Sequence, residues 1–153
     1  MDTVYMRYLN MNLKERPMNI TSYDDLIHAA RAQPQPQRLL FAFARAELPD
    51  DAGADQRAGF AEQRGGALAP VMCVDKTADE LGSFADLVAE SKHTGKEWDI
   101  VFVTTMSGRN GQPPASTEAE APLNMMVTYI HTGQIGQFLA FGRDGELRQF
   151  AQA

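Results

Sequence analysis

The chain has 153 residues, of which 44% are hydrophobic and 22% charged, and its 20 acidic and 14 basic residues give a net charge of −6. This length suits one domain that folds without disulfides, and no apolar run approaches the about 18 residues that a membrane span needs. Because the net charge is negative and the cations are scattered singly, we expect a soluble domain with neither nucleic acid nor membrane as partner.

The first 17 residues differ from the rest, because residues 3–9 are rich in β-formers and a polar break follows them. Residues 1–8 have Arg7 as their one basic residue and no apolar core before a cleavage site, so we predict a cytoplasmic protein without a secretory signal. We expect the arm to be docked, as an edge strand or against a second copy of the chain. Its predicted contact residues are Val4, Tyr5, Met6, Tyr8 and Leu9. The predicted organisation is an arm over residues 1–17 and a single α/β domain over 18–153, with Met18 as an alternative start.

Three segments place apolar residues at helical spacing after a Ser or Thr that has an acid three residues on, the pattern of a capped amphipathic helix. These segments predict helices at residues 22–32, at 78–92 and from about 121 to Gly133. Prolines in residues 33–37 end the first helix, because proline disfavours the helical conformation in the residue before it.

Apolar runs between the helices predict strands, and two more β-prone runs flank Asp144 and Gly145, a strong hairpin signal. The predicted strands cover residues 38–45, 71–75, 98–104, 135–141 and 146–150. Residues 39–44 are apolar on both faces, as in parallel strands that are covered on two sides. We therefore expect an α/β fold: a mixed, largely parallel sheet of five or six strands, packed by helices and finished by a C-terminal antiparallel hairpin.

Two features lie around the second predicted strand. An acidic loop at residues 48–54 and a weak helix at 55–63, interrupted by Gly59, precede it. Cys73 lies inside the apolar run 71–74, so we interpret it as a small buried residue and not as a reactive thiol. Because it is the one cysteine of the chain, it cannot form an internal disulfide, which agrees with a reducing compartment.

The sequence contains no recognisable catalytic set. His28, His93 and His131 stand alone, without the closely spaced ligands of a metal site, and we expect all three to be exposed. Neither a serine nucleophile elbow nor a glycine-rich dinucleotide turn is present. We therefore predict no catalytic residue, no metal and no cofactor, and leave open whether the protein is an enzyme.

One loop is a candidate binding site. Residues 108–111 read Gly-Arg-Asn-Gly and follow the third predicted strand. Ligands of open α/β sheets bind beyond the carboxyl ends of strands, so polar residues at this exit can hold an anion. The candidate ligand-binding residues are Thr105, Ser107, Arg109 and Asn110. The alternative is an ordinary surface loop, which is rich in the same residue types.

Five segments of the chain resemble a family of small uncharacterised bacterial proteins that carries the label "ribonucleotide reductase subunit alpha". They are residues 18–26, 38–41, 46–50, 71–76 and 138–145. The label implies a thiyl radical and a cysteine pair that serves as reductant. Because Cys73 alone cannot do both, we take the label to be mistaken and transfer no nucleotide reduction.

A looser likeness concerns the order of the first elements: a capped helix, a proline-bearing connector, an apolar strand and the exit Ala46-Glu-Leu-Pro. This order is similar to the amino-terminal module of SseB-type proteins, and the resemblance implies protein association and not catalysis.

Two functional hypotheses follow. The first is a non-enzymatic protein-interaction module that forms a homodimer through the arm and an exposed strand edge, with a further protein partner that the sequence does not identify. The second is a small-molecule or anion binder with Arg109 as its charged anchor.

Overall fold

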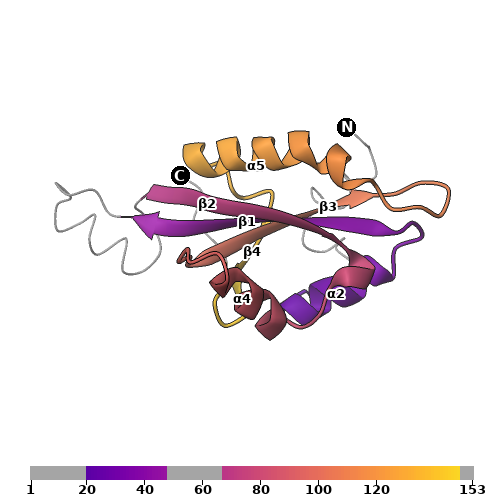
Figure 1. Cartoon of the computed structure of the whole chain (residues 1–153), viewed down its shortest axis with the longest axis horizontal. Coiled ribbons are helices and arrows are strands. Elements are labelled where there is room, and N and C mark those ends of the chain that lie inside the picture. Colours follow the sequence, from indigo (N-terminus) through magenta and orange to yellow (C-terminus); the bar gives the residue numbers. More distant parts are fainter. Residues whose placement is uncertain (1–19, 48–66, 149–153) are drawn as a thin grey trace.

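The computed structural model describes residues 20–47 and 67–148. Figure 1 shows three layers: a central sheet, the helices α2 (Tyr23–Arg31) and α4 (Phe84–Lys92) on one side, and the helix α5 (Glu120–Thr132) on the other. The predicted arm, the acidic loop and the weak helix at 55–63 lie outside the described residues.

The sheet of the described residues has five strands in the order β2-β1-β3-β4-β5, and every neighbouring pair is antiparallel. The strands are β1 (Gln37–Glu47), β2 (Ala67–Thr77), β3 (Ile100–Ser107), β4 (Leu139–Gly142) and β5 (Leu147–Arg148). The strand β1 therefore lies inside the sheet, between β2 and β3.

The expected largely parallel sheet is wrong, although strands and helices do combine in one α/β fold. Residues 39–44 are buried on both faces because α2 and α5 cover opposite sides of β1, and an antiparallel strand can be covered in the same way. The strands β2 and β3 do run in the same direction and are joined through a helix, as in a parallel unit. However, β1 is inserted between them and pairs with both.

The helix α2 (Tyr23–Arg31) forms where it is predicted, because its first turn is capped. The Asp25 N–H donates to the Ser22 hydroxyl at 3.3 Å, and the Asp25 carboxylate accepts the N–H and the hydroxyl of Thr21, both at 3.0 Å. These bonds, above all the one from the Thr21 N–H, lower the pKa of Asp25.

The single helix expected at residues 78–92 is two helices, η1 (Ala78–Glu80) and α4 (Phe84–Lys92). A second capping box breaks the segment: Ser83 and Asp86 exchange backbone-to-side-chain hydrogen bonds, both of 3.1 Å. A residue that caps a new helix has a non-helical backbone, so Ser83 cannot also continue the preceding one.

The third helix, α5 (Glu120–Thr132), begins within one residue of its expected start and follows the short helix η2 (Ser116–Ala119). Pro122 lies in its first turn and Gly133 ends it, both as predicted. The C-terminal hairpin is also confirmed, since β4 and β5 pair around the turn at Asp144 and Gly145. In that hairpin β4 begins only at Leu139, not at residue 135.

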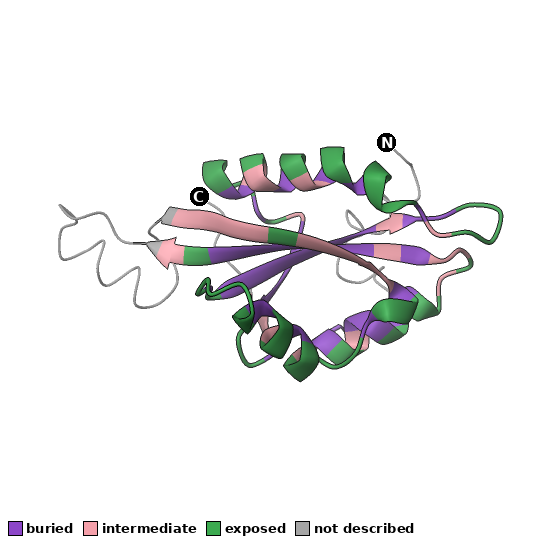
Figure 2. Cartoon of the chain, viewed as in Figure 1, coloured by how far each residue is buried: buried purple, intermediate pink, exposed green. Residues whose placement is uncertain are grey.

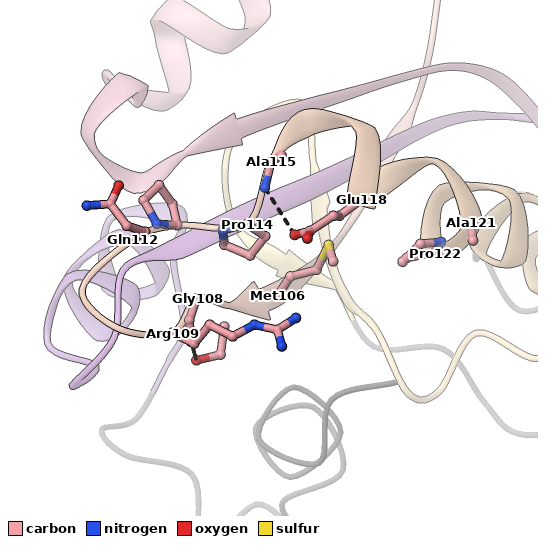
Figure 3. Close-up of a pocket in the computed structure, with 11 residues that line it drawn as sticks. Met106, Gly108, Arg109, Gln112, Pro114, Ala115, Glu118, Ala121 and Pro122 are labelled. Carbon is pink, nitrogen blue, oxygen red and sulfur yellow. Dashed lines mark hydrogen bonds between the residues drawn. The ribbon is translucent and has the colours of Figure 1, made fainter.

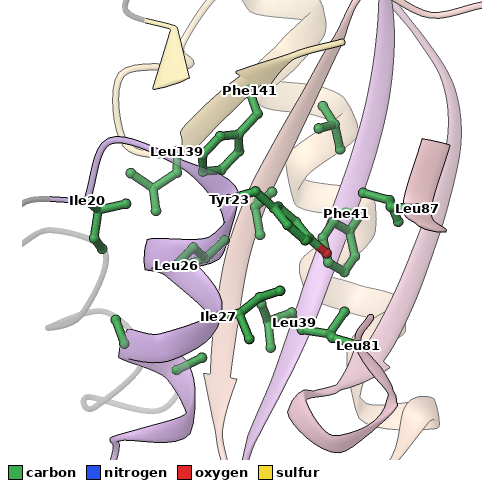
Figure 4. Close-up of a cluster of buried hydrophobic side chains, with 14 of the residues drawn as sticks. Ile20, Tyr23, Leu26, Ile27, Leu39, Phe41, Leu81, Leu87, Leu139 and Phe141 are labelled. Atoms are coloured by element: carbon green, nitrogen blue, oxygen red, sulfur yellow. The ribbon is translucent and has the colours of Figure 1, made fainter. Parts of the chain in front are cut away.

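Each face of the sheet has its own hydrophobic core. Figure 4 shows the core beneath α2, where the ring of Tyr23 lies 6.3 Å from that of Phe41 and 5.9 Å from that of Phe141. Burial in this core raises the pKa of the Tyr23 hydroxyl. The other core lies beneath α5, around Phe102 and Met126. No helix in the described ranges has the length and apolar character to cross a bilayer.

Candidate functional site

The outer edge of β2 is the first candidate site. Within the described part of the chain, β2 bonds to β1 on one side and to no strand on the other. Figure 2 shows most of β2 as intermediate in burial, whereas the inner strands are buried along much of their length. The side chains of Val71, Met72 and Val74 pack only partly into the core beneath α2.

The expectation that Cys73 is buried is wrong. Its apolar run is typical of an inner strand, but β2 is an edge strand, and Cys73 is exposed. Neighbouring atoms nevertheless remove part of the water around its sulfur, and this desolvation raises the pKa of the Cys73 thiol.

Charges appear on β2 only at its C-terminal end, and there they pair within the chain. Asp75 accepts a hydrogen bond of 2.6 Å from Arg38, and Lys76 donates one of 2.9 Å to Glu90. Residues 67–74 carry no charge at all. This uncharged stretch is interrupted by a bulge: Ala44 faces Pro70 and Phe43 faces Met72, which leaves Val71 without a partner.

A pocket of about 580 Å³ is the second candidate site. It lies where β3 ends, between the following turn and the start of α5, on the face of the sheet that α5 covers. Figure 3 shows Arg109 and Glu118 on either side of Met106 in that view. Its walls are largely apolar and include Met106, Pro114 and Pro122.

Two of the four predicted ligand-binding residues, Ser107 and Arg109, line this pocket. The Ser107 hydroxyl is already engaged, since it accepts the Gln37 side-chain N–H at 3.2 Å and donates to the Gly108 carbonyl at 3.3 Å. Thr105 points to the opposite face of β3 from Met106, where its buried hydroxyl has no hydrogen-bond partner among the described residues. Asn110 is exposed and does not line the pocket.

Asn110 instead shapes the backbone. Residues 109–112 form a two-residue hairpin turn, in which Asn110 has φ 54° and Gly111 has φ 74°. Arg109 and Gln112 exchange backbone hydrogen bonds, both of 3.0 Å. These angles and bonds are those of a type I′ turn, which Asn-Gly favours. The sequence signal for this turn is therefore the Asn-Gly pair at residues 110–111, and not the two glycines of residues 108–111 on which the predicted binding loop depends.

The pocket wall is attached to the sheet by charged groups. Arg38 donates a hydrogen bond of 2.7 Å to the carbonyl oxygen of Pro114, and the Ser116 hydroxyl donates one of 2.8 Å to Asp75. Glu118 stabilises the N-terminus of η2, because its carboxylate accepts a hydrogen bond of 3.1 Å from the Ala115 N–H. No local sequence pattern relates Glu118 or Pro122 to Arg109, because folding brings them together from separate parts of the chain.

The remaining predicted residues are placed as follows. His28, His93 and His131 are all exposed, as expected. In the described ranges, no three His, Cys, Asp or Glu side chains gather as a metal site would require. The predicted contact residues of the arm, from Val4 to Leu9, lie outside the described residues.

Compared with protein-family models, with curated proteins and with solved structures, the chain has no significant match.

Proposed function

We propose that this protein is a protein-interaction module whose edge strand β2 pairs with β2 of a second copy to form a homodimer. The observation that carries the proposal is an edge strand of 11 residues with a run of partly exposed apolar side chains and no outer neighbour among the described residues. Such an edge presents unpaired N–H and C=O groups to any chain that can add a strand.

The charge pattern favours a second copy of the same chain as the occupant. Two copies each carry a net charge of −6 and repel one another, so a shared contact must be poor in like charges. Residues 67–74 satisfy this condition, and Asp75 is already neutralised by Arg38. Antiparallel pairing of identical strands also obeys the two-fold symmetry that most homodimers have.

A reducing compartment suits an exposed cysteine, because in an oxidising one its thiol can form a disulfide with another molecule. We therefore keep the cytoplasm as the proposed location.

Sedimentation velocity over a range of micromolar concentrations tests the proposal. The natural chain is expected to pass from monomer to dimer as its concentration rises. Cys73→Lys is expected to raise the dimer Kd about tenfold or more, since an edge lysine loses water when a second strand covers it. Cys73→Ser is the matched control, because it keeps a small uncharged side chain at the same exposed position, and it should leave the Kd nearly unchanged.

Thiol cross-linking gives an independent measurement. With the two-fold axis at the middle of residues 67–74, the two Cys73 residues are offset by about five residues, roughly 17 Å along the strands. A bismaleimide that spans this distance should therefore join two copies at concentrations where sedimentation detects the dimer. A chain that stays monomeric throughout, or Lys and Ser variants with equal Kd values, contradicts the proposal.

A further inference from the structure

The pocket beside Arg109 has the size and lining of a small-molecule site. Its volume of about 580 Å³ falls within the range of about 300–1,000 Å³ that is typical of such sites. Like them, it combines largely apolar walls with a few polar groups.

The charged group available to a ligand is the guanidinium of Arg109. Within residues 20–47 and 67–148 it has neither a hydrogen-bond nor an ion-pair partner. Its backbone is held by the two hydrogen bonds of the type I′ turn, and the neighbouring Gly111 N–H donates to the Gln35 side chain at 3.0 Å. The side chain therefore starts from a fixed point at the pocket rim, from which it can bind a carboxylate through two parallel hydrogen bonds.

The lining also restricts the charge of the ligand. Glu118 lines the same pocket, and the Ala115 N–H occupies one of its oxygens. Its negative charge stays in the lining and repels a second anionic group on a ligand. One cation with one anion nearby therefore favours a ligand with a single negative charge.

The backbone of the lining disfavours phosphate. Pro113, Pro114 and Pro122 all line the pocket, and none has an N–H to donate. Phosphate sites in proteins rely on several converging backbone N–H groups. Prolines and the flexible Met106 side chain instead present apolar surface, against which a flat or aliphatic body can pack.

From these observations we propose that the pocket binds a small organic monocarboxylate, with its carboxylate on Arg109 and its apolar body between Met106, Pro114 and Pro122. This site is separate from the proposed dimer edge, and each can be tested without the other.

The experiment is an amide NMR titration of the full chain at constant ionic strength, with benzoate as the probe. Benzoate is expected to cause saturable shifts around Met106, Arg109 and Glu118, whereas the uncharged benzamide, the dianion phthalate and inorganic phosphate should bind at least about tenfold more weakly. Arg109→Gln should weaken benzoate binding about tenfold or more. Lys96→Gln removes the same charge at an exposed position outside the pocket and should change nothing.

Two further variants separate shape from charge. Ala121→Leu fills part of the pocket from an exposed helix position and should abolish benzoate binding, whereas Ala89→Leu makes the same change on an exposed face of α4 and should not. Glu118→Gln should bring phthalate closer to benzoate in affinity. Equal binding of benzoate and benzamide, phosphate binding as tight as that of benzoate, or a titration without saturable shifts overturns the proposal.

Discussion

The two edges of the sheet are built differently. Within the described residues, the edge at β5 is two residues long, and the chain around the start of α2 covers it. The Leu147 N–H donates to the Thr21 carbonyl and the Tyr23 N–H to the Gly145 carbonyl, both at 3.2 Å. The edge at β2 is 11 residues long, and no described segment pairs with its outer side.

The two edges therefore differ in how readily they can pair with a second chain. A short edge whose backbone groups are already bonded offers little to a second chain, whereas a long, uncharged one offers a full row of donors and acceptors. The two edges also differ in charge. Asp144 and Arg148 form an ion pair of 2.8 Å beside the covered edge, whereas residues 67–74 of the open edge have no charge. Stability is therefore expected to depend mainly on the covered edge, and self-association on the open one.

The largest expected effect is the loss of Tyr23. Its ring is almost fully buried between Phe41, Phe84 and Phe141, so Tyr23→Ala leaves a cavity beneath the covered edge. We expect the free energy of unfolding to fall by about 3–5 kcal/mol. The measurement is urea denaturation at a concentration where the chain is monomeric.

The matched change on the open edge is Met72→Ala. Met72 is only partly buried, so its truncation should lower the free energy of unfolding by about 1 kcal/mol, because less apolar area is lost from the core. Equal losses in the two variants would contradict the contrast between the edges.

The next effect concerns the turn of the covered hairpin. Gly145 has φ 82°, a left-handed conformation that costs other residues roughly 1–2 kcal/mol, and an added Cβ would lie 3.1 Å from the Phe84 ring. Gly145→Ala should therefore lower the melting temperature more than Gly95→Ala. Gly95 has a similar φ of 73°, but an added Cβ meets no atom of the described residues within 4 Å. Thermal unfolding followed by circular dichroism compares the two, and a larger shift for Gly95→Ala would argue against close packing at this edge.

The smallest effect is a response to acid. The Arg148 guanidinium lowers the pKa of Asp144, and hydrogen bonds from Thr21 lower that of Asp25. Both carboxylates therefore stabilise the folded chain fully above the ordinary Asp pKa of 3.8, and this stabilisation is lost as the pH falls below that value through the lowered pKa values. Below that pH, hydrogen exchange of the Leu147 amide should speed up relative to that of the β2 amides. In Asp144→Asn this increase in exchange rate should be smaller. A Leu147 amide whose protection matches β2 at every pH contradicts this prediction.

The sequence relates some of the residues that line the candidate pocket to one another, but not all of them. Arg109 and Ser107 come after the predicted strand at 98–104, and ligand sites favour strand exits, although the structure extends β3 to Ser107. Thr105 does not line the pocket, because its hydroxyl is buried on the face of β3 opposite to Met106, one residue further from the end of the strand than the lining residues. Glu118 and Pro122 were missed because no local pattern relates them to Arg109, and only the folded chain brings them together.

By itself, the sequence determined the features that depend on neighbours a few residues apart: the caps at Ser22 and Thr77, the end of α5 at Gly133 and the hairpin turn at Gly145. Tertiary structure alone decided the order and direction of the strands, the exposure of Cys73 and the walls of the pocket. The reason is physical, because caps and turns are closed by local hydrogen bonds, whereas a strand can pair in either direction with whatever partner the packing of both sheet faces allows.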